Sequence, residues 1–374
     1  MKITAIEPIY VGIPYKHDAP KTTLGTGEVR EVMDAVYLKV ETDAGITGWG
    51  EAFGFGACQI SHAACKIVVR PLAVGREIDD IPGLMAELYR KTQGMSLKGP
   101  VRNALGALDI ALWDIKGKAL GKPIWQLLGG DGSRQQIPVY ASLLRTGKAE
   151  HVERLCVSAK ERGYRHIKIH EHNDETVAAV ERARKTVGDD FELMLDTNCA
   201  WSSDKAVGKV KAIKPYKLKW VEEPVYPADD FGAMARVRKE TGVPIAAGEN
   251  LGTVPELTRL LEAGGVDYVQ PDVGKFGGIC EMVRAADVAQ AKGVAFMPHS
   301  PVYGPILIAT QHIVAALKSE NLCEYYYCDL AESPMGEWAI PRDGFFRVPN
   351  GPGLGVDVDE DILARYRLPD PGSK

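Results

Sequence analysis

The chain of 374 residues contains no long hydrophobic run and no block of basic charge. No segment reaches the roughly 18 consecutive apolar residues that a membrane-spanning helix requires. Lysine and arginine are dispersed and the net charge is −5, whereas proteins that follow nucleic acid or an anionic membrane concentrate their basic side chains. These absences argue against nucleic acid and membranes as partners.

The cysteines follow no pattern. The seven cysteines are scattered, and the closest pair, Cys323 and Cys328, matches no metal-binding spacing. A disulfide framework is therefore not indicated, and a reducing compartment fits best. Residues 1–15 alternate apolar and polar side chains as a strand does, and they lack the apolar core of a signal peptide. We therefore expect a cytoplasmic protein.

Four short apolar runs, in contrast, each end in an acid. The acids are Asp196, Glu222, Glu249 and Asp272, in the runs FELMLDTN, LKWVEEP, PIAAGEN and YVQPDVGK. Successive acids lie about 23 to 27 residues apart, which is room for one strand, one helix and two loops. Parallel strands joined in this way place their carboxyl ends at one face, where several carboxylates would repel one another without a cation. Oxygen ligands of this kind favour Mg2+.

The strand–helix alternation extends over the second part of the chain. From Gln136 onward we count eight predicted strands with helices between successive ones, which is the pattern of a (β/α)8 barrel. The first 120 or so residues differ, since predicted strands are followed by predicted helices in an α+β arrangement. The fold class is therefore α/β, with a barrel preceded by an α+β region.

Other ionisable side chains follow the same strand ends. They are Lys168, His170, Lys275, His299 and Glu324, together with the polar but non-ionisable Asn198. Alternation places Lys168 and His170 on one face of their strand, so Lys168 either pairs with an anion or acts as a base. Asp272 precedes His299 by one strand and could accept a hydrogen bond from its ring nitrogen. In a barrel of this kind, chemistry takes place at the carboxyl ends of the strands.

A long polar loop at residues 14–28 separates the first two predicted strands. Loops of this length are often functional flaps or ordered surface loops. Its side chains Tyr15, Lys16, His17, Asp18 and Lys21 would suit a hydroxyl-rich or doubly charged substrate. The loop is equally compatible with a solvated surface segment.

The ordered set of motifs resembles the enolase superfamily, and within it the mandelate racemase subgroup. The resemblance covers nearly the whole chain and rests on these stretches: GKALGKPIWQLLGG (117–130), LDTN (195–198), WVEEP (220–224), AAGEN (246–250), QPDVGKFGG (270–278), MPHSP (297–301), LCEY (322–325) and NGPGLGVDVDED (350–361). It implies a modified TIM barrel closed by an α+β capping domain made from both termini. We accordingly expect a capping domain at 1–128, a barrel at 129–328 and a returning segment at 329–374.

The resemblance also implies roles for individual residues. Asp196, Glu222 and Glu249 correspond to the ligands of one Mg2+ ion per subunit. Asp272 and His299 match the subgroup's dyad, with His299 as a base. Glu324 matches the acid that hydrogen-bonds the developing enediolate, which requires a raised pKa. Lys168 matches the first lysine of the subgroup's Lys-x-Lys pair, near the substrate carboxylate. Substrate contacts are expected from the remaining candidates, namely Asn198, Lys275, Tyr15, Lys16 and His17.

One position departs from the subgroup's pattern, because His170 stands where the second lysine is usual. It either exchanges a proton with the substrate or only binds it. Family resemblance favours Mg2+-dependent abstraction of the α-proton of a carboxylate, and within the subgroup dehydration of an acid sugar to a 2-keto-3-deoxy acid. A racemase or epimerase of an α-hydroxy or amino acid, a sugar-lactone cycloisomerase, and a non-catalytic binding protein are the alternatives. A homo-oligomer is expected.

Overall fold

The computed structural model describes residues 1–20, 29–319 and 321–371. An antiparallel sheet is formed by the first three strands and a short strand from the tail, in the order β12-β1-β2-β3. These strands are β1 (Ile3–Lys16), β2 (Val32–Thr42), β3 (Thr47–Ala52) and β12 (Asp329–Leu330). One face of the sheet carries the alternating apolar side chains of β1 and β2, and helices cover it.

The helices of this region pack on the sheet through α4 (Pro100–Leu120), which is buried on nearly all sides, as its apolar sequence predicts. The other helical segments are α1 (Cys58–Ala64), η1 (Cys65–Val69), α2 (Arg70–Ala73), α3 (Ile81–Lys91) and α5 (Ile124–Leu127). Close approach of α4 to β3 requires glycine, because a Cβ at Gly50 would lie 1.9 Å from the carbonyl oxygen of Ala107. The helix thus lies directly against the sheet.

The barrel follows, as predicted. Its parallel strands are β4 (Gln136–Ser142), β5 (His166–His170), β6 (Glu192–Asp196), β7 (Val221–Glu222), β8 (Ile245–Ala247), β9 (Tyr268–Val269), β10 (Ala295–Phe296) and β11 (Cys323–Tyr326). They pair in the order β10-β9-β8-β7-β6-β5-β4-β11. Within the described ranges β10 and β11 share no ladder. Their junction is bridged by hydrogen bonds from Asn321 Nδ2 to the Phe296 carbonyl and from the Leu322 amide to Met297 Sδ.

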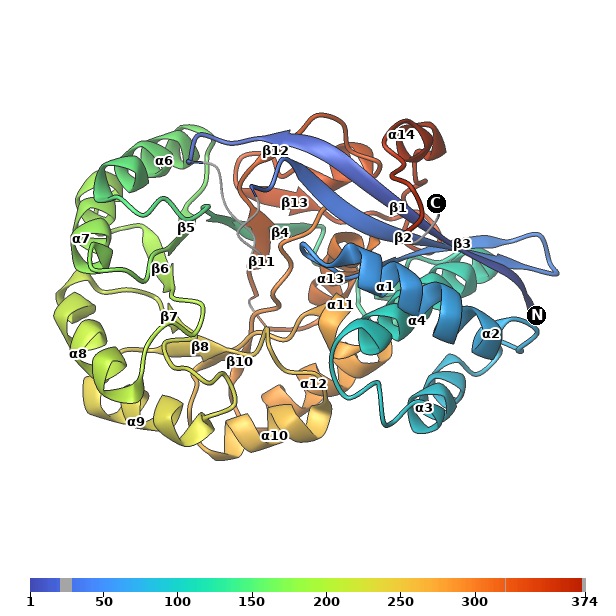
Figure 1. The fold of residues 1–374 in the computed structure, drawn as a ribbon, viewed down its shortest axis with the longest axis horizontal. Helices are drawn as coiled ribbons and strands as arrows, with labels where there is room; N and C mark the ends of the chain where they lie inside the picture. The colour runs from blue at the N-terminus through green and yellow to red at the C-terminus, as the bar shows by residue number, and fades with distance from the viewer. Residues whose placement is uncertain (21–28, 320, 372–374) are drawn as a thin grey trace.

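Helices surround the barrel on the outside, as Figure 1 shows. They are α6 (Ala149–Glu161), α7 (Thr176–Val187), α8 (Ser203–Ile213), η2 (Lys214–Tyr216), α9 (Phe231–Thr241), α10 (Val254–Glu262), α11 (Val273–Phe276), α12 (Ile279–Ala291) and α13 (Pro305–Ala316). The barrel interior is filled by a separate cluster of side chains from Tyr140, Met194, Trp220, Ala246, Met297 and Leu322. The barrel is therefore a packed core that supports the side chains at its carboxyl end.

The tail leaves the barrel and contacts both parts of the molecule. After β12 it forms η3 (Gly336–Ala339), β13 (Phe345–Arg347), which pairs antiparallel with β4, and α14 (Glu360–Arg365). The Leu368 amide then donates to the Tyr10 carbonyl of β1, and both termini lie at the same side of the molecule (Figure 1). The three-part division at residues 128 and 328 remains our proposal. Among the described residues, no helix combines the length and apolarity required to cross a bilayer.

Candidate active site

Three of the predicted carboxylates converge at the carboxyl end of the barrel. The register pairs Asp196 of β6 with Glu222 of β7, so these side chains are direct neighbours. Glu249 follows β8, the next strand in the sheet. Each of the three residues offers an oxygen, and these oxygens all lie within 4.8 Å of one another. Asp196 and Glu222 are buried and Glu249 is partly exposed, so the cluster opens to one side.

The Glu222 carboxylate is held from below by three donors. Its Oε2 atom accepts hydrogen bonds from Trp220 Nε1 at 3.0 Å and from Gln270 Nε2 at 2.8 Å. Its Oε1 atom lies 2.7 Å from Lys168 Nζ. Lys168 is 0 % exposed, and its ammonium also lies 3.1 Å from Glu324 Oε1 and 3.5 Å from Asp196 Oδ2. The structure therefore places Lys168 among carboxylates in the barrel interior.

Asp272 and His299 form the predicted pair. Asp272 Oδ2 lies 2.6 Å from His299 Nδ1, and Asp272 Oδ1 accepts from the Gly274 amide at the start of α11. This second contact fixes the carboxylate, which in turn orients the imidazole. His299 Nε2 points towards the carboxylate cluster, 3.0 Å from Glu249 Oε2 and 3.8 Å from Glu324 Oε2. The Ser300 amide donates to Glu324 Oε2 at 2.9 Å.

His170 faces the same cluster from another wall. It pairs with Asp196 in the β5–β6 register, and its Nε2 lies 3.0 Å from Asp196 Oδ2. Its Nδ1 lies 2.6 Å from the Leu143 carbonyl, so only Nε2 can interact with a ligand. Asn198 contacts both oxygens of Asp196. Its backbone amide donates to Oδ1 at 2.7 Å, and its side-chain Nδ2 donates to Oδ2 at 3.1 Å.

The cluster forms the floor of a pocket of about 560 Å3. It is lined by Pro20, Arg30, Phe53, Phe55, Ser142, Leu144, Arg145, Thr146, Gly147, His170, Asp196, Asn198, Glu249, Lys275, His299, Pro301, Glu324 and Tyr326. Lys275 belongs to the wall, with its Nζ 3.2 Å from Asn250 Oδ1 and 3.9 Å from Glu249 Oε1. The structure thus brings together Asp196, Glu249, His170, His299, Glu324, Asn198 and Lys275 around one space, with Glu222, Lys168 and Asp272 directly behind them.

The three predicted loop residues lie elsewhere. Tyr15, Lys16 and His17 line a different hollow, which also contains Arg162 and Asp329. Lys21 falls outside the described residues, so within them only Pro20 of this loop reaches the pocket above the carboxylates. A role for Tyr15, Lys16 and His17 in substrate binding remains a prediction.

Two family models match this chain. Residues 150–362 match the enolase C-terminal domain-like model, and residues 16–129 match the N-terminal domain model of mandelate racemase and muconate lactonizing enzyme. The chain belongs to the enolase superfamily. The resemblance drawn from the motifs is thereby confirmed, as is the expectation of an enzyme.

Named relatives of this superfamily member act on acid sugars. The chain is 35 % identical over 353 residues to D-galactonate dehydratase of Ralstonia pickettii, covering 88 % of this chain and 90 % of that one. It is 31 % identical over 358 residues to D-galactarolactone cycloisomerase of Agrobacterium fabrum, covering 90 % and 92 %.

Solved structures of the superfamily share the whole fold. The 3,6-anhydro-D-galactonate cycloisomerase of Zobellia galactanivorans superposes with a TM-score of 0.85 at 28 % identity, covering 99 % of this chain and 100 % of that one. A mandelate racemase/muconate lactonizing protein of Paracoccus denitrificans, complexed with magnesium, gives 0.85 at 29 % identity and 98 % coverage of both chains. The predicted barrel with its capping region is thus confirmed.

Burial and mutual repulsion shift the acids of this superfamily site in different directions. Burial raises the pKa of Glu222 to about 7, and the charges of Asp196 and Glu324 add to this effect. Burial also opposes ionisation of Glu249, but His299 and Lys275 outweigh it and lower its pKa to about 2. Such divergence among neighbouring carboxyl groups is typical of functional sites.

Neighbouring carboxylates favour the protonated forms of Lys168 and His299. Burial alone would lower the pKa of Lys168, but the carboxylates of Glu222 and Glu324 outweigh it and hold this pKa well above its usual range. Lys168 is therefore paired with anions in this structure, and a role as a base remains a prediction. Burial likewise opposes protonation of His299, yet Glu249 and Glu324 raise its pKa well above the usual range.

The prediction of a raised pKa for Glu324 is wrong for this structure. Burial does raise the pKa, as crowding was expected to do, but Lys168 and His299 lie close enough to lower it below its ordinary value. The sequence could not show that Lys168 would lie 3.1 Å from this carboxylate. In this structure Glu324 Oε2 accepts the hydrogen bond from the Ser300 amide.

Several residues of the site were not singled out from the sequence. Arg30, Phe53, Phe55 and Tyr326 reach the pocket, the first three from loops that show no periodic pattern. Glu223 is a further buried acid. Its burial and the nearby Glu249 raise its pKa to about 8. The signal for Glu223 was its place beside Glu222 at a strand end. Nothing in the local sequence indicated the others.

Proposed function

We propose that the protein catalyses Mg2+-dependent dehydration of an acid sugar to a 2-keto-3-deoxy acid. The observation that carries this proposal is the convergence of three carboxylates and the Asp272–His299 pair on one pocket. The dehydratase relatives support the acid-sugar class. A cation site beside an oriented base is the arrangement needed to remove a weakly acidic proton next to a carboxylate.

The residues present fit a hard divalent cation. Asp196, Glu222 and Glu249 supply only oxygen atoms, and their mutual proximity raises the cost of ionising Glu222 unless a cation lies between them. Trp220 and Gln270 fix the orientation of Glu222 from behind. When bound there, Mg2+ would stabilise the negative charge that develops on the substrate carboxylate.

His299 is placed to move the α-proton. Asp272 holds Nδ1, so Nε2 is the atom that faces the pocket and exchanges a proton with the substrate. In this structure Nε2 contacts an oxygen of Glu249, one of the proposed ligands. If Glu249 held a cation through that oxygen, the oxygen would no longer be available to the histidine. His299 Nε2 then becomes free to accept the proton as the Cα–H bond breaks.

Elimination requires a second proton transfer. The β-hydroxyl leaves as water when its oxygen takes up a proton and the Cβ–O bond breaks, and the resulting enol becomes the 2-keto acid once the β-carbon is protonated. His170 and His299 are the pocket groups that can deliver these protons. His170, at the end of β5, presents only Nε2 to the pocket. In the sheet, β5 is separated from β11 by β4. We assign it the leaving-group side of the substrate.

Proton NMR in D2O tests the proposal. The enzyme with Mg2+ is incubated with a panel of aldonates, aldarates and simple α-hydroxy acids. We expect loss of an α-proton signal together with a new 2-keto product, and neither change with the His299→Asn variant. Asn can occupy the same space but cannot accept the proton.

The same spectra separate the alternatives. Exchange of the α-proton without elimination would replace dehydration by racemisation or epimerisation. Conversion of lactones alone would favour cycloisomerisation, the activity named for the Agrobacterium fabrum relative. No exchange with any acid, in a preparation shown to bind Mg2+, would refute the proposed function.

A further inference from the structure

Arg30 is a buried guanidinium with unused hydrogen-bond donors. Its side chain lies just before β2 and is only 4 % exposed. Nη2 donates to Asp34 Oδ1 at 3.1 Å, while Nε and Nη1 have no partner among the described residues. Leaving charged donors unpaired in the interior costs free energy, so such groups in native proteins generally await a ligand or a water molecule.

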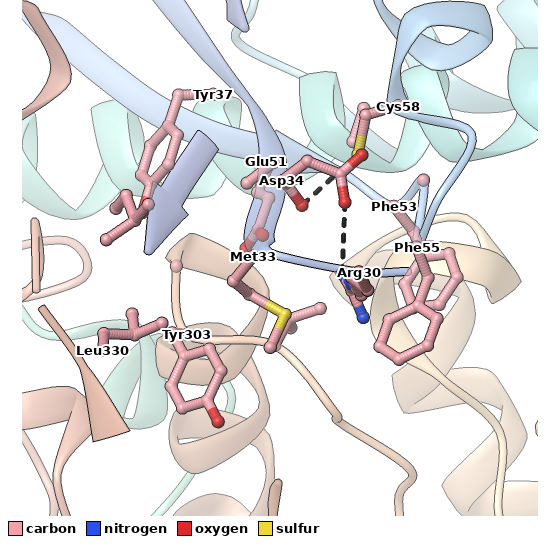
Figure 2. Close-up of a pocket in the computed structure, with 16 residues that line it drawn as sticks. Arg30, Met33, Asp34, Tyr37, Glu51, Phe53, Phe55, Cys58, Tyr303 and Leu330 are labelled. Atoms are coloured by element: carbon pink, nitrogen blue, oxygen red, sulfur yellow. Dashed lines mark hydrogen bonds and ion pairs between the residues drawn. The ribbon is translucent and has the colours of Figure 1, made fainter. Parts of the chain in front are cut away.

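The position of Arg30 connects it to the active site. It lines both the pocket above the carboxylate cluster and the hollow that contains Tyr15 and Lys16, and its guanidinium lies 4.0 Å from the centre of the Phe55 ring. Phe55 stacks on Phe53 at 6.2 Å, and the Lys275 ammonium lies 5.4 Å from the Phe53 ring centre. One wall therefore runs from Lys275, beside Glu249, to Arg30. Figure 2 shows Arg30 next to both rings and joined to Asp34.

A single buried water cannot satisfy both free donors. Behind Arg30, a cavity of about 20 Å3 lies between the sheet of β1–β3 and the loop before α13, lined in part by Asp34, Tyr37 and Glu51 (Figure 2). This volume accommodates about one water molecule. The Nε and Nη1 donors of a guanidinium do not share an edge of its plane, so one water can accept from only one of them. At least one of these two buried donors is therefore left without a partner among the described residues, in a side chain that forms part of the pocket wall.

The charge of the pocket indicates which chemical group would pair with the Arg30 guanidinium. Within the described lining, the acids are Asp196, Glu249 and Glu324, and all three belong to the cluster on the floor. Arg145, a second guanidinium, also lines the pocket and donates to Asn198 Oδ1 at 2.6 Å. A guanidinium has donors but no acceptor, so its partner must offer lone pairs, and a carboxylate is its strongest match.

We propose that Arg30 binds a second carboxylate at the far end of the substrate, which makes the substrate a dicarboxylic acid sugar. This inference rests on the proposed function, because the first carboxylate would have to bind the cation held by Asp196, Glu222 and Glu249. The Phe53–Phe55 wall lies beside the polyhydroxy chain between the two carboxylates. Arg30 thereby discriminates against aldonates, whose far end is a neutral hydroxymethyl group.

The test compares pairs of aldarates and aldonates that have the same chain length and configuration. With the wild-type enzyme and Mg2+, we expect kcat/KM for the best aldarate to exceed that of its aldonate at least about tenfold. Arg30→Met should lower kcat/KM for the aldarate about 10- to 100-fold and change the aldonate value little, which corresponds to loss of a hydrogen bond to a charged group. The aldarate, but not the aldonate, should raise Tm less in this variant than in wild type.

Arg238→Met is the matched control. Arg238 also pairs with an aspartate, Asp267. This pair does not line the pocket, because Asp267 accepts from the Ile245 amide at the start of β8, whereas the pocket lies at the carboxyl ends of the strands. We expect this variant to leave the aldarate preference unchanged. If Arg30→Met does not fold, the Arg30→Lys variant, which keeps the charge, is compared with wild type instead. We expect Arg30→Lys to retain part of the wild-type preference for aldarates over aldonates.

The outcomes separate the two proposals. An enzyme that dehydrates aldonates as well as aldarates, or an Arg30→Met variant that loses activity on both equally, overturns the role of Arg30 and leaves the dehydratase function standing. An enzyme that acts on neither class, although it binds Mg2+, overturns the proposed function and this inference with it.

Discussion

Gln270 offers a clean perturbation of the proposed metal site. Its Nε2 donates to Glu222 Oε2 at 2.8 Å, and its Oε1 has no hydrogen-bond partner among the described residues. Gln270→Met therefore removes one hydrogen bond to a buried carboxylate and breaks no other side-chain contact of this kind. A hydrogen bond to a charged group contributes about 1.5–3 kcal/mol, so we expect Mg2+ to bind about 10- to 100-fold more weakly.

The chain contains a matched control for this substitution. Gln311 of α13 is equally buried, donates one Nε2 hydrogen bond to the Trp338 carbonyl at 3.0 Å, and also has an unpartnered Oε1. Gln311→Met should cost comparable stability without changing Mg2+ affinity.

Calorimetric titration with Mg2+ and the Mg2+-dependent rise in Tm measure the effect without relying on activity. If a folded Gln270→Met variant binds Mg2+ within about threefold of wild type, while Gln311→Met behaves as expected, the assignment of Glu222 as a ligand oriented from behind is refuted.

Two further predictions concern the buried acids Asp272 and Glu51. Asp272→Asn keeps an oxygen for the Gly274 amide but can present an amide N–H to His299 Nδ1, which favours the tautomer whose proton is on Nε2. We expect kcat to fall about 10^3- to 10^4-fold at near-constant Mg2+ affinity. A loss below tenfold would contradict the role of the pair. Burial raises the pKa of Glu51 to about 8, and its stabilising contribution is therefore present below about pH 4.5 and lost as the pH rises towards 8. Glu51→Gln cannot ionise at this position. Its free energy of unfolding relative to wild type should therefore be higher at pH 9 than at pH 5, by on the order of a few kcal/mol. The same difference between variant and wild type at both pH values would disprove this.

Much of the barrel could be predicted from local pattern. The acids at the ends of successive apolar runs, such as Asp196 and Glu222, follow from the repeat of strand and helix, because parallel strands necessarily place their carboxyl ends together. The Asp272–His299 pair followed from the same rule, since neighbouring strand ends are neighbours in space. Even the buried α4 was recognisable, since an apolar helix must be covered on every side.

The loops and the balance of charge were not predictable in this way. Tyr15, Lys16 and His17 looked suitable for a substrate, but β1 extends to Lys16 and carries these side chains to another hollow. Arg30 and Phe55 show no periodicity, and only the packing of the first sheet over the barrel brings them to the pocket. The sequence by itself determined which side chains meet at the barrel's end, because backbone hydrogen bonding fixes strand register. Only the tertiary structure decided their protonation and the far wall of the pocket, because pKa values and loop positions depend on distances between segments remote in sequence.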